Sequence, residues 1–356
     1  MQLAIIGFPQ SGKSTVLQAV TGGKGESGKP GKAALGVVKV PDSRLAPLTG
    51  MFKPKKVVMA EITYLDIPGG GGLGKGKGIE GQFLNDLARV DALIHVVGAF
   101  QHPETDGATL REEVSNMEME LAFSDLAIIE RRLQRVESSM KSNKAPERDA
   151  AQREKALLTR LKEGLEGEVP VRDQKVAPEE RPVLNNFQLL TSKPLIVVLN
   201  ISEAQLPQAE QLEVSARRPN HPNDQPVAVC GKLEAELALM DEADAQEFRK
   251  DAGIKESSLR RMVRLSYDAL GLETFLTVGP DEVRAWSVQR GSPAPKAAGK
   301  IHSDIERGFI RAEVVTYDDL IAAGGLPEAR KRGVLRMEGK TYVVKDGDVI
   351  NFLFNV

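Results

Sequence analysis

The sequence predicts an α/β protein in which a mainly parallel sheet is interrupted by an inserted α-helical hairpin and followed by a small β-rich domain. Three observations support this class. The first is an apolar strand that runs into a glycine-rich loop and a helix, "AIIGFPQSGKST" at residues 4–15. The second is a long central stretch with helical spacing between strand patterns, and the third is a C-terminal stretch of short strands and turns.

Strands and helices alternate over the first hundred residues. Apolar runs predict strands, and apolar positions three and four residues apart predict helices. The expected strands are Gln2–Ile6, 57–66 and Ala92–Val97, and the expected helices are Lys13–Val20 and Gln82–Val90. Alternation of this kind is typical of a parallel sheet covered by helices.

The helical pattern of residues 110–165 interrupts this alternation. Apolar residues recur at helical spacing from Leu110 to Met140 and again from Leu157 to Leu165, with the polar stretch "SNKAPERD" between them. Two core helices would give the same spacing, but the densely charged outer faces favour a projecting antiparallel coiled-coil hairpin. The sheet pattern resumes at Pro194–Asn200, so the hairpin is an insertion. The expected domains are 1–105 and 183–273 for the sheet domain, 106–182 for the insertion and 274–356 for the C-terminal domain.

Composition narrows the class of protein. The 356 residues carry a net charge of −2 and are 41% apolar, which argues against a generally basic nucleic-acid binder. The single cysteine, Cys230, cannot form an internal disulfide, which fits a reducing cytoplasm. No apolar run of about 18 residues is present to span a bilayer. We therefore expect a soluble cytoplasmic protein without a membrane partner.

The glycine-rich loop has the spacing of a phosphate-binding loop. Gly7 and Gly12 frame it, and Lys13 and Ser14 follow. Glycines let backbone N–H groups turn toward phosphates, and the helix N-terminus adds a favourable dipole. Lys13 would reach the terminal phosphates, and the Ser14 hydroxyl would bind Mg²⁺. Gln10, Ser11, Gly12 and Thr15 complete the candidate loop. A chance glycine turn is the alternative, which the flanking strand and helix disfavour.

Two further stretches lie at strand ends. Asp66-Ile67-Pro68-Gly69 is a D-x-x-G, which places a carboxylate near the metal and a glycine near the terminal phosphate. Asn200-Ile201-Ser202-Glu203 occupies the position where guanine-specific GTPases carry N-K-x-D. Ile201 and Glu203 replace the lysine and aspartate of that motif. Because adenine offers an acceptor where guanine offers a donor, these replacements weaken guanine selectivity and permit adenine.

On these residues the sequence resembles the YchF family, the Obg-like ATPases. The resemblance rests on the phosphate loop, "DIPG", "FLNDLARVDALIHVV", the helical insertion, "LLTSKPLIVVLNISE" and the C-terminal "VRAWSVQRGSPAPKAAGKIHSDIERGFIRAEVVTYDDL". It implies a P-loop NTPase G domain with a C-terminal β-grasp TGS domain, a preference for ATP and association with the ribosome. It also assigns Cys230, Gly231 and Lys232 to the last base-contacting loop.

The sequence departs from the family pattern in the phosphate-binding loop and in the two switches. Gln10 and Ser11 replace an asparagine–valine pair whose asparagine is associated with potassium in related GTPases. Pro30 stands where the first switch carries a threonine, and Gly70 replaces the hydrophobic residue after D-x-x-G. Gly69 and Gly70 are thus expected in a second switch, and His102 is a weak candidate for proton transfer.

The sequence therefore predicts a Mg²⁺-dependent protein that binds ATP, or GTP, and hydrolyses ATP slowly. Two alternatives stay open: a nucleotide-gated interaction protein that does not hydrolyse, and a GTPase of Obg type. A P-loop kinase is disfavoured, because D-x-x-G and N-x-x-E would then have no role.

Overall fold

The computed structural model describes residues 1–23, 34–67, 78–79, 81–102, 107–140, 145–219, 221, 225–251, 254 and 257–355. These residues form two compact units. The first consists of Met1–Gly36 and Thr63–Met262, and the second of Val37–Ile62 and Val263–Val356. The chain thus passes from the first unit into the second and back before the central helices. The four domains expected from the sequence remain a prediction.

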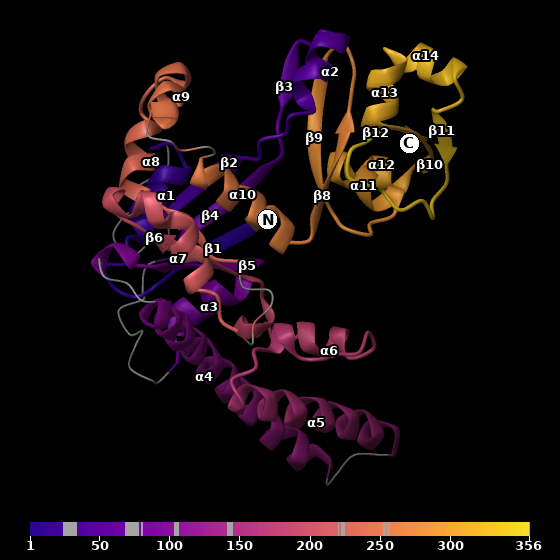
Figure 1. The fold of residues 1–356 in the computed structure, drawn as a ribbon. Coiled ribbons are helices and arrows are strands. Elements are labelled where there is room, and N and C mark those ends of the chain that lie inside the picture. Colours follow the sequence, from indigo (N-terminus) through magenta and orange to yellow (C-terminus); the bar gives the residue numbers. More distant parts are fainter. Residues whose placement is uncertain are drawn as a thin grey trace. The chain divides into compact units, whose positions relative to one another are not determined.

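The first unit is built on a six-stranded sheet of order β2-β4-β1-β5-β6-β7 (Figure 1). Its strands are β1 (Gln2–Ile6), β2 (Ala34–Lys39), β4 (Glu61–Asp66), β5 (Ala92–Val97), β6 (Leu195–Asn200) and β7 (Val227–Val229). The pairs β1–β4, β1–β5, β5–β6 and β6–β7 are parallel. The predicted α/β class with its parallel sheet is confirmed.

One predicted strand divides into two. The apolar run at 57–66 forms β3 (Lys56–Val58) and β4, not one strand. β3 pairs in parallel with β9 (Glu282–Gln289) of the second unit, whereas β4 pairs with β1. The prediction of one continuous strand was wrong because each half finds its partner strand in a different sheet.

The first unit also contains helices, two of which form the inserted hairpin. They are α1 (Lys13–Val20), α3 (Gly81–Arg89), α4 (Gly107–Met140), α5 (Ala145–Glu166), α6 (Arg181–Asn185), α7 (Ala209–Ser215), α8 (Gly231–Leu237), α9 (Glu242–Asp251) and α10 (Ser258–Ala269), the last of which continues into the second unit. In α1 the inward residues Val16, Leu17 and Val20 are buried, as their spacing predicts.

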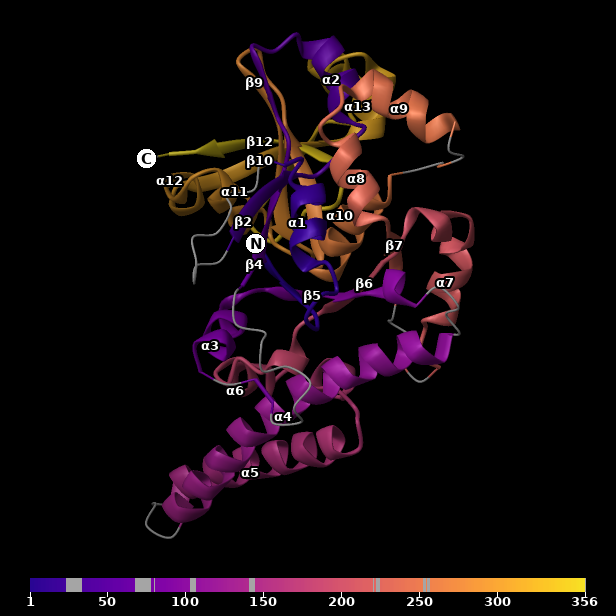
Figure 2. The same ribbon diagram turned by 90° about the vertical axis from the view of Figure 1, so that its left-hand side faces the viewer.

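Helices α4 and α5 lie side by side as an antiparallel hairpin (Figure 2). Ile129 of α4 packs in one buried cluster with Leu157, Leu158 and Leu161 of α5. Ion pairs also join the two helices: Arg132–Glu154, Glu137–Lys155 and Glu130–Lys162. The predicted helical insertion is confirmed. No helix within the described ranges is both long and apolar enough to cross a membrane.

The second unit contains a sheet of order β11-β10-β12-β8-β9-β3. Its further elements are α2 (Leu45–Phe52), β8 (Leu272–Thr277), α11 (Ala294–Ile301), α12 (Ser303–Arg307), β10 (Phe309–Thr316), α13 (Tyr317–Ala323), α14 (Leu326–Lys331), β11 (Arg336–Glu338) and β12 (Asp348–Phe354). Trp286 stacks on Phe275 in the core, and the His302 ring nitrogen Nδ1 accepts from the Asp304 amide at 3.1 Å, which caps α12.

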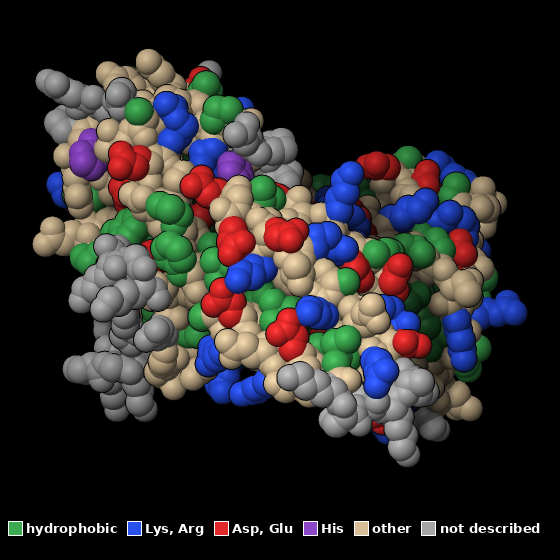
Figure 3. Space-filling model, turned by 90° about the horizontal axis from the view of Figure 1, so that it is seen from below, with side chains coloured by type: hydrophobic (Ala, Val, Ile, Leu, Met, Phe, Trp, Pro, Cys, Tyr) green, Lys and Arg blue, Asp and Glu red, His purple; other side chains and the backbone are tan. Residues whose placement is uncertain are grey.

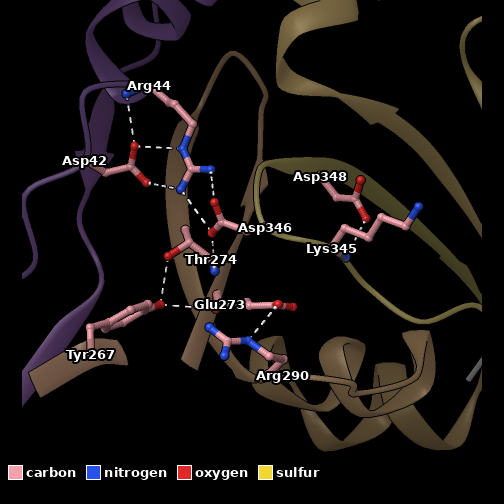
Figure 4. A network of polar contacts seen from close by, with 9 residues as sticks. All are labelled: Asp42, Arg44, Tyr267, Glu273, Thr274, Arg290, Lys345, Asp346 and Asp348. Carbon is pink, nitrogen blue, oxygen red and sulfur yellow. Dashed lines mark hydrogen bonds and ion pairs between the residues drawn. The ribbon is translucent and has the colours of Figure 1, made fainter. Parts of the chain in front are cut away.

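A polar network fixes α2 within this unit (Figure 4). The Arg44 guanidinium donates to Asp42 at 2.8 and 2.9 Å and to Asp346 at 2.7 Å. Asp346 also accepts from the Thr274 amide at 2.9 Å. Burial opposes the charge on Arg44, but the hydrogen bonds to both carboxylates outweigh it and raise the pKa of the guanidinium. Arg44 therefore joins residues near 42 to residues near 346.

Candidate functional site

The loop between β1 and α1 has the backbone of a tight anion-binding turn. Gln10 and Gly12 both have positive φ, at 66° and 88°. A Cβ on Gly12 would lie 2.1 Å from Nδ2 of Asn200, so the position accepts only glycine. Ser11 is buried between these residues. The loop therefore presents the N-terminus of α1, whose first backbone N–H groups have no partner within the helix.

Asn200, at the end of β6, joins this loop to a third segment. Its Nδ2 donates to the Ser11 carbonyl at 3.0 Å, and its Oδ1 accepts from the Gly231 amide at 3.2 Å. Asn200 is 5% exposed, so both bonds are sheltered from water. The Asn200 side chain thus joins the loop between β1 and α1 to the N-terminus of α8.

Lys13 lies across the loop. Its Nζ donates to the carbonyls of Gly7 at 3.0 Å and Phe8 at 2.9 Å. Burial lowers the pKa of Lys13, and the nearby Asp66 carboxylate opposes this shift. The Lys13 ammonium is therefore partly desolvated at the N-terminus of α1, where it can attract an anion.

Ser14 and Asp66 meet beside Lys13. The Ser14 Oγ donates to Asp66 Oδ2 at 2.6 Å. Asp66 is brought there because β4 pairs in parallel with β1, with Ile5 opposite Asp66. A hydroxyl and a carboxylate are the hard oxygen ligands that Mg²⁺ prefers. Within the described ranges no three His, Cys, Asp or Glu side chains gather as a metal site, so phosphate oxygens and water would have to supply further ligands.

The segment after β6 forms the other end of the site. The Ile201 side chain is buried, and its amide donates to the Val229 carbonyl at 3.0 Å, so this amide is already occupied within the fold. Lys232 Nζ lies 3.5 Å from Glu203 Oε1, and both side chains are exposed. Cys230 is buried, and burial raises the pKa of its thiol. Thr15 approaches Gly231 from α1.

Other predicted residues are not brought together in this way. Gly69 and Gly70, with the first-switch position Pro30, lie outside the described residues. His102 is exposed, and its carbonyl accepts from Gln205 Nε2 at 3.4 Å. Glu113 of α4, which the sequence analysis did not single out, accepts through Oε1 from the Gly98 amide at 3.4 Å, and burial raises the pKa of this carboxyl.

Two residues near the loop were missed from the sequence. Gln101 donates through Nε2 to the Gln10 carbonyl at 2.8 Å. His95 of β5 is fully buried edge-on to the Phe8 ring, and neither ring nitrogen has a hydrogen-bond partner among the described residues. Burial, then Arg218 and Lys13, lower the pKa of His95 to about 3, so it is neutral. In the sequence, the feature that could have drawn attention to His95 is its position within the apolar strand "ALIHVV".

Comparisons with known proteins agree with this geometry. The profile of the 50S ribosome-binding GTPases matches residues 2–130, and the profile of the C-terminal domain of YchF-type GTPases, described as a protein of unknown function, matches residues 272–355. The chain is 39% identical to the ribosome-binding ATPase YchF of Bacillus subtilis and 35% identical to that of Escherichia coli O157:H7, covering 99% of this chain and 98% of each relative.

Solved structures are similar as well. The YchF GTPase of Schizosaccharomyces pombe superposes with a TM-score of 0.85 at 30% identity, over 99% of this chain and 97% of that one. A GTP-binding protein of Pyrococcus horikoshii gives a TM-score of 0.62 at 16% identity, which shows a common fold.

Proposed function

Because the chain belongs to the YchF family, we propose that it is a Mg²⁺-dependent nucleotide hydrolase that prefers ATP to GTP, hydrolyses ATP slowly to ADP and phosphate, and acts as a ribosome-linked switch. The observation that carries this proposal is the contact between Ser14 and Asp66 at the start of α1, with Lys13 beside it. A cation, a hydroxyl and a carboxylate converge where the helix N-terminus favours an anion.

Residues of the loop between β1 and α1, together with Asp66, would bind the phosphates and the metal. The Lys13 ammonium, with backbone N–H groups of α1, would hold the terminal phosphates. The Ser14 hydroxyl and the Asp66 carboxylate would hold Mg²⁺, which supplies charge neutralisation at the phosphates when bound. Asn200 keeps the loop in register with the base-side segment through its two sheltered hydrogen bonds.

The base-side segment supports a modest preference for adenine. The 6-amino group of adenine is a donor that the Ile201 carbonyl could accept, whereas the amide of that residue is already bonded to Val229. Glu203 would favour guanine by accepting from two ring-edge donors, but Lys232 lies within 3.5 Å and partly neutralises its charge. The proposed preference for ATP therefore has two sources. The Ile201 carbonyl could accept from adenine, and Lys232 reduces the attraction of the Glu203 carboxylate for guanine.

Slow turnover is proposed from the sequence of the switches. Phosphoryl transfer depends on positioned water, metal and cations, since the protein supplies little covalent chemistry. Pro30 replaces a metal-binding threonine, and Gly70 has no side chain with which to order water. A docked partner could complete the site, and the names of the relatives point to the ribosome as that partner.

Surface charge bears on how a ribosome would be bound. On the face of the molecule in Figure 3, Lys and Arg side chains are interspersed with Asp and Glu. For a partner bound at this face, the mixture favours shape-specific docking over general attraction to RNA phosphates.

Hydrolysis of GTP is the second candidate. Glu203 keeps a carboxylate at the guanine-reading position, and the matching profile and the yeast structure carry the name GTPase. Calorimetric titration of the purified protein with non-hydrolysable ATP and GTP analogues in Mg²⁺ separates the two. Tighter binding of the ATP analogue supports the proposal, and tighter binding of the GTP analogue overturns the adenine assignment.

A further inference from the structure

The inner face of α4 holds the chain that leaves the D-x-x-G stretch. The Gly78 amide donates to Glu120 Oε2 at 3.0 Å, and the Ile79 amide donates to Ser124 Oγ at 2.6 Å. Glu120 is 3% exposed and Ser124 is 4% exposed. Both acceptors belong to the hairpin helix, 42 and 45 residues further along the chain than the amides they bind.

The position of Gly78 against α4 requires a glycine. Gly78 has a φ of +76°, and a Cβ there would lie 2.9 Å from the Ser124 backbone nitrogen. Ser124 donates its own proton to the Glu120 carbonyl at 3.0 Å, so its lone pairs are left to accept from Ile79. The Ile79 side chain is buried in one cluster with Met117 and Leu121 of the same helix face. Hydrogen bonds thus hold both residues, and apolar packing holds Ile79 as well.

The anchored residues belong to the same stretch of chain as the proposed metal ligand. β4 ends at Asp66, which is held at the site by its pairing with β1 and by Ser14. Twelve residues later the chain is held again at Gly78, and α3 starts at Gly81. Ile79 also shares its buried cluster with Ile67, the residue directly after Asp66, and Phe8 of the loop between β1 and α1 packs against the same cluster, so the anchored residues are in packing contact with both sides of the site.

We propose that Glu120 and Ser124 are positioning residues for nucleotide hydrolysis, and that through them the helical hairpin is coupled to the nucleotide site. This inference rests on the proposed function. Helix α4 continues without interruption from Ser124 to Met140, roughly 24 Å at 1.5 Å per residue. A partner that shifts the hairpin would therefore act on Gly78 and Ile79 through one rigid element, and binding at the two places would be reciprocally linked.

Substitution of Ser124 tests the proposal, with Ser138 as a matched control. Ser138 lies on the same helix, and among the described residues its hydroxyl donates within the helix, to the Gln134 carbonyl. We expect Ser124→Ala to lower kcat for ATP at least fivefold with nucleotide Kd changed less than twofold, and Ser138→Ala to change neither. Glu120→Gln, which keeps an acceptor oxygen, should lower kcat less than Glu120→Ala.

Amide hydrogen exchange gives a readout that does not depend on turnover. We expect slow exchange at Gly78 and Ile79 in the unsubstituted protein and at least tenfold faster exchange at Ile79 in Ser124→Ala. Unprotected amides in the unsubstituted protein, or an unchanged kcat in Ser124→Ala, would overturn the proposal.

Complete absence of turnover, even with ribosomes, would count against the proposed function and not by itself against the anchor. In that case the deciding comparison is exchange at Ile79 with Mg-ATP and with Mg-ADP. A difference that is present in the unsubstituted protein and lost in Ser124→Ala supports the coupling, and identical exchange in both nucleotides rejects it.

Discussion

The Ser14 hydroxyl donates a 2.6 Å hydrogen bond to the Asp66 carboxylate across 52 residues of sequence. The contact exists because α1 starts directly after β1, and β4 lies parallel to β1 and ends at the same edge of the sheet. Carboxyl ends of parallel strands are where open α/β sheets bind ligands. In this contact the Ser14 hydroxyl is bonded directly to the Asp66 carboxylate. These are the two groups that would together bind Mg²⁺.

Lys13→Ala should weaken binding of ATP at least tenfold, which corresponds to about 1.4 kcal/mol. The substitution removes the cation that bonds the Gly7 and Phe8 carbonyls at the helix N-terminus, where terminal phosphates would lie. Calorimetric titration measures the change. Lys155→Ala, on the hairpin, is the control and should bind like the unsubstituted protein. Undiminished affinity in Lys13→Ala would show that this loop is not the binding site.

Ile201→Lys combined with Glu203→Asp should shift the ratio of ATP to GTP affinity toward GTP. The pair recreates the N-K-x-D arrangement, in which a shorter carboxylate accepts from two guanine donors. Lys232→Ala should shift the ratio in the same direction by a smaller factor, because it removes the cation 3.5 Å from Glu203. A ratio that stays constant in both variants contradicts the account of base selection.

His95 should make folding weaker at acidic pH. The unfolded chain binds a proton at this histidine near pH 6.5, whereas the folded chain binds it only near pH 3. The unfolded state therefore carries more protons between these values, and the free energy of unfolding falls as the pH drops below about 6.5.

His95→Phe should reduce this dependence, since the ring would still pack against Phe8. The exposed His302 provides the control as His302→Asn, which keeps a helix-capping side chain. Urea unfolding from pH 4.5 to 7.5, followed by circular dichroism, measures the slope. An equal slope in His95→Phe and the unsubstituted protein would exclude His95 as its source.

Arg44→Ala should destabilise the second unit by about 2 kcal/mol, because it leaves Asp42 and Asp346 without their shared charged donor. Arg290→Ala removes an exposed pair with Glu273 in the same unit and should cost less than about 1 kcal/mol. Trp286, the one tryptophan of the chain, lies in β9, so its fluorescence during urea unfolding reports on this unit. Equal effects of the two substitutions would show that the Arg44 network has no special weight.

Local patterns were enough to predict much of the first unit. β1, α1 and β5 begin and end where burial and helical spacing place them in the sequence. The meeting of Ser14 with Asp66 could also be foreseen, since both belong to motifs at the same edge of a parallel sheet. These features depend on neighbours in sequence or on a general rule of sheet topology.

Features that depend on distant partners could not be foreseen. The run at 57–66 divides because residues 282–284 accept its first part as a neighbouring strand. Glu120 has a charged side chain, which on a helix normally indicates solvent exposure, yet it is buried against Gly78. Gln101 reaches Gln10 only once β5 has been placed beside β1. None of these contacts leaves a periodic signal in the sequence.

ATP turnover with and without ribosomes tests the central claim most directly. Phosphate release is measured on the purified protein in Mg²⁺, alone and with a series of ribosome concentrations, with Lys13→Ala as the blank. The account predicts little turnover by the protein alone and a clear, saturable increase with ribosomes, because a docked partner completes a site whose own residues bind the phosphates without ordering water. Rapid turnover by the isolated protein that ribosomes leave unchanged would contradict it.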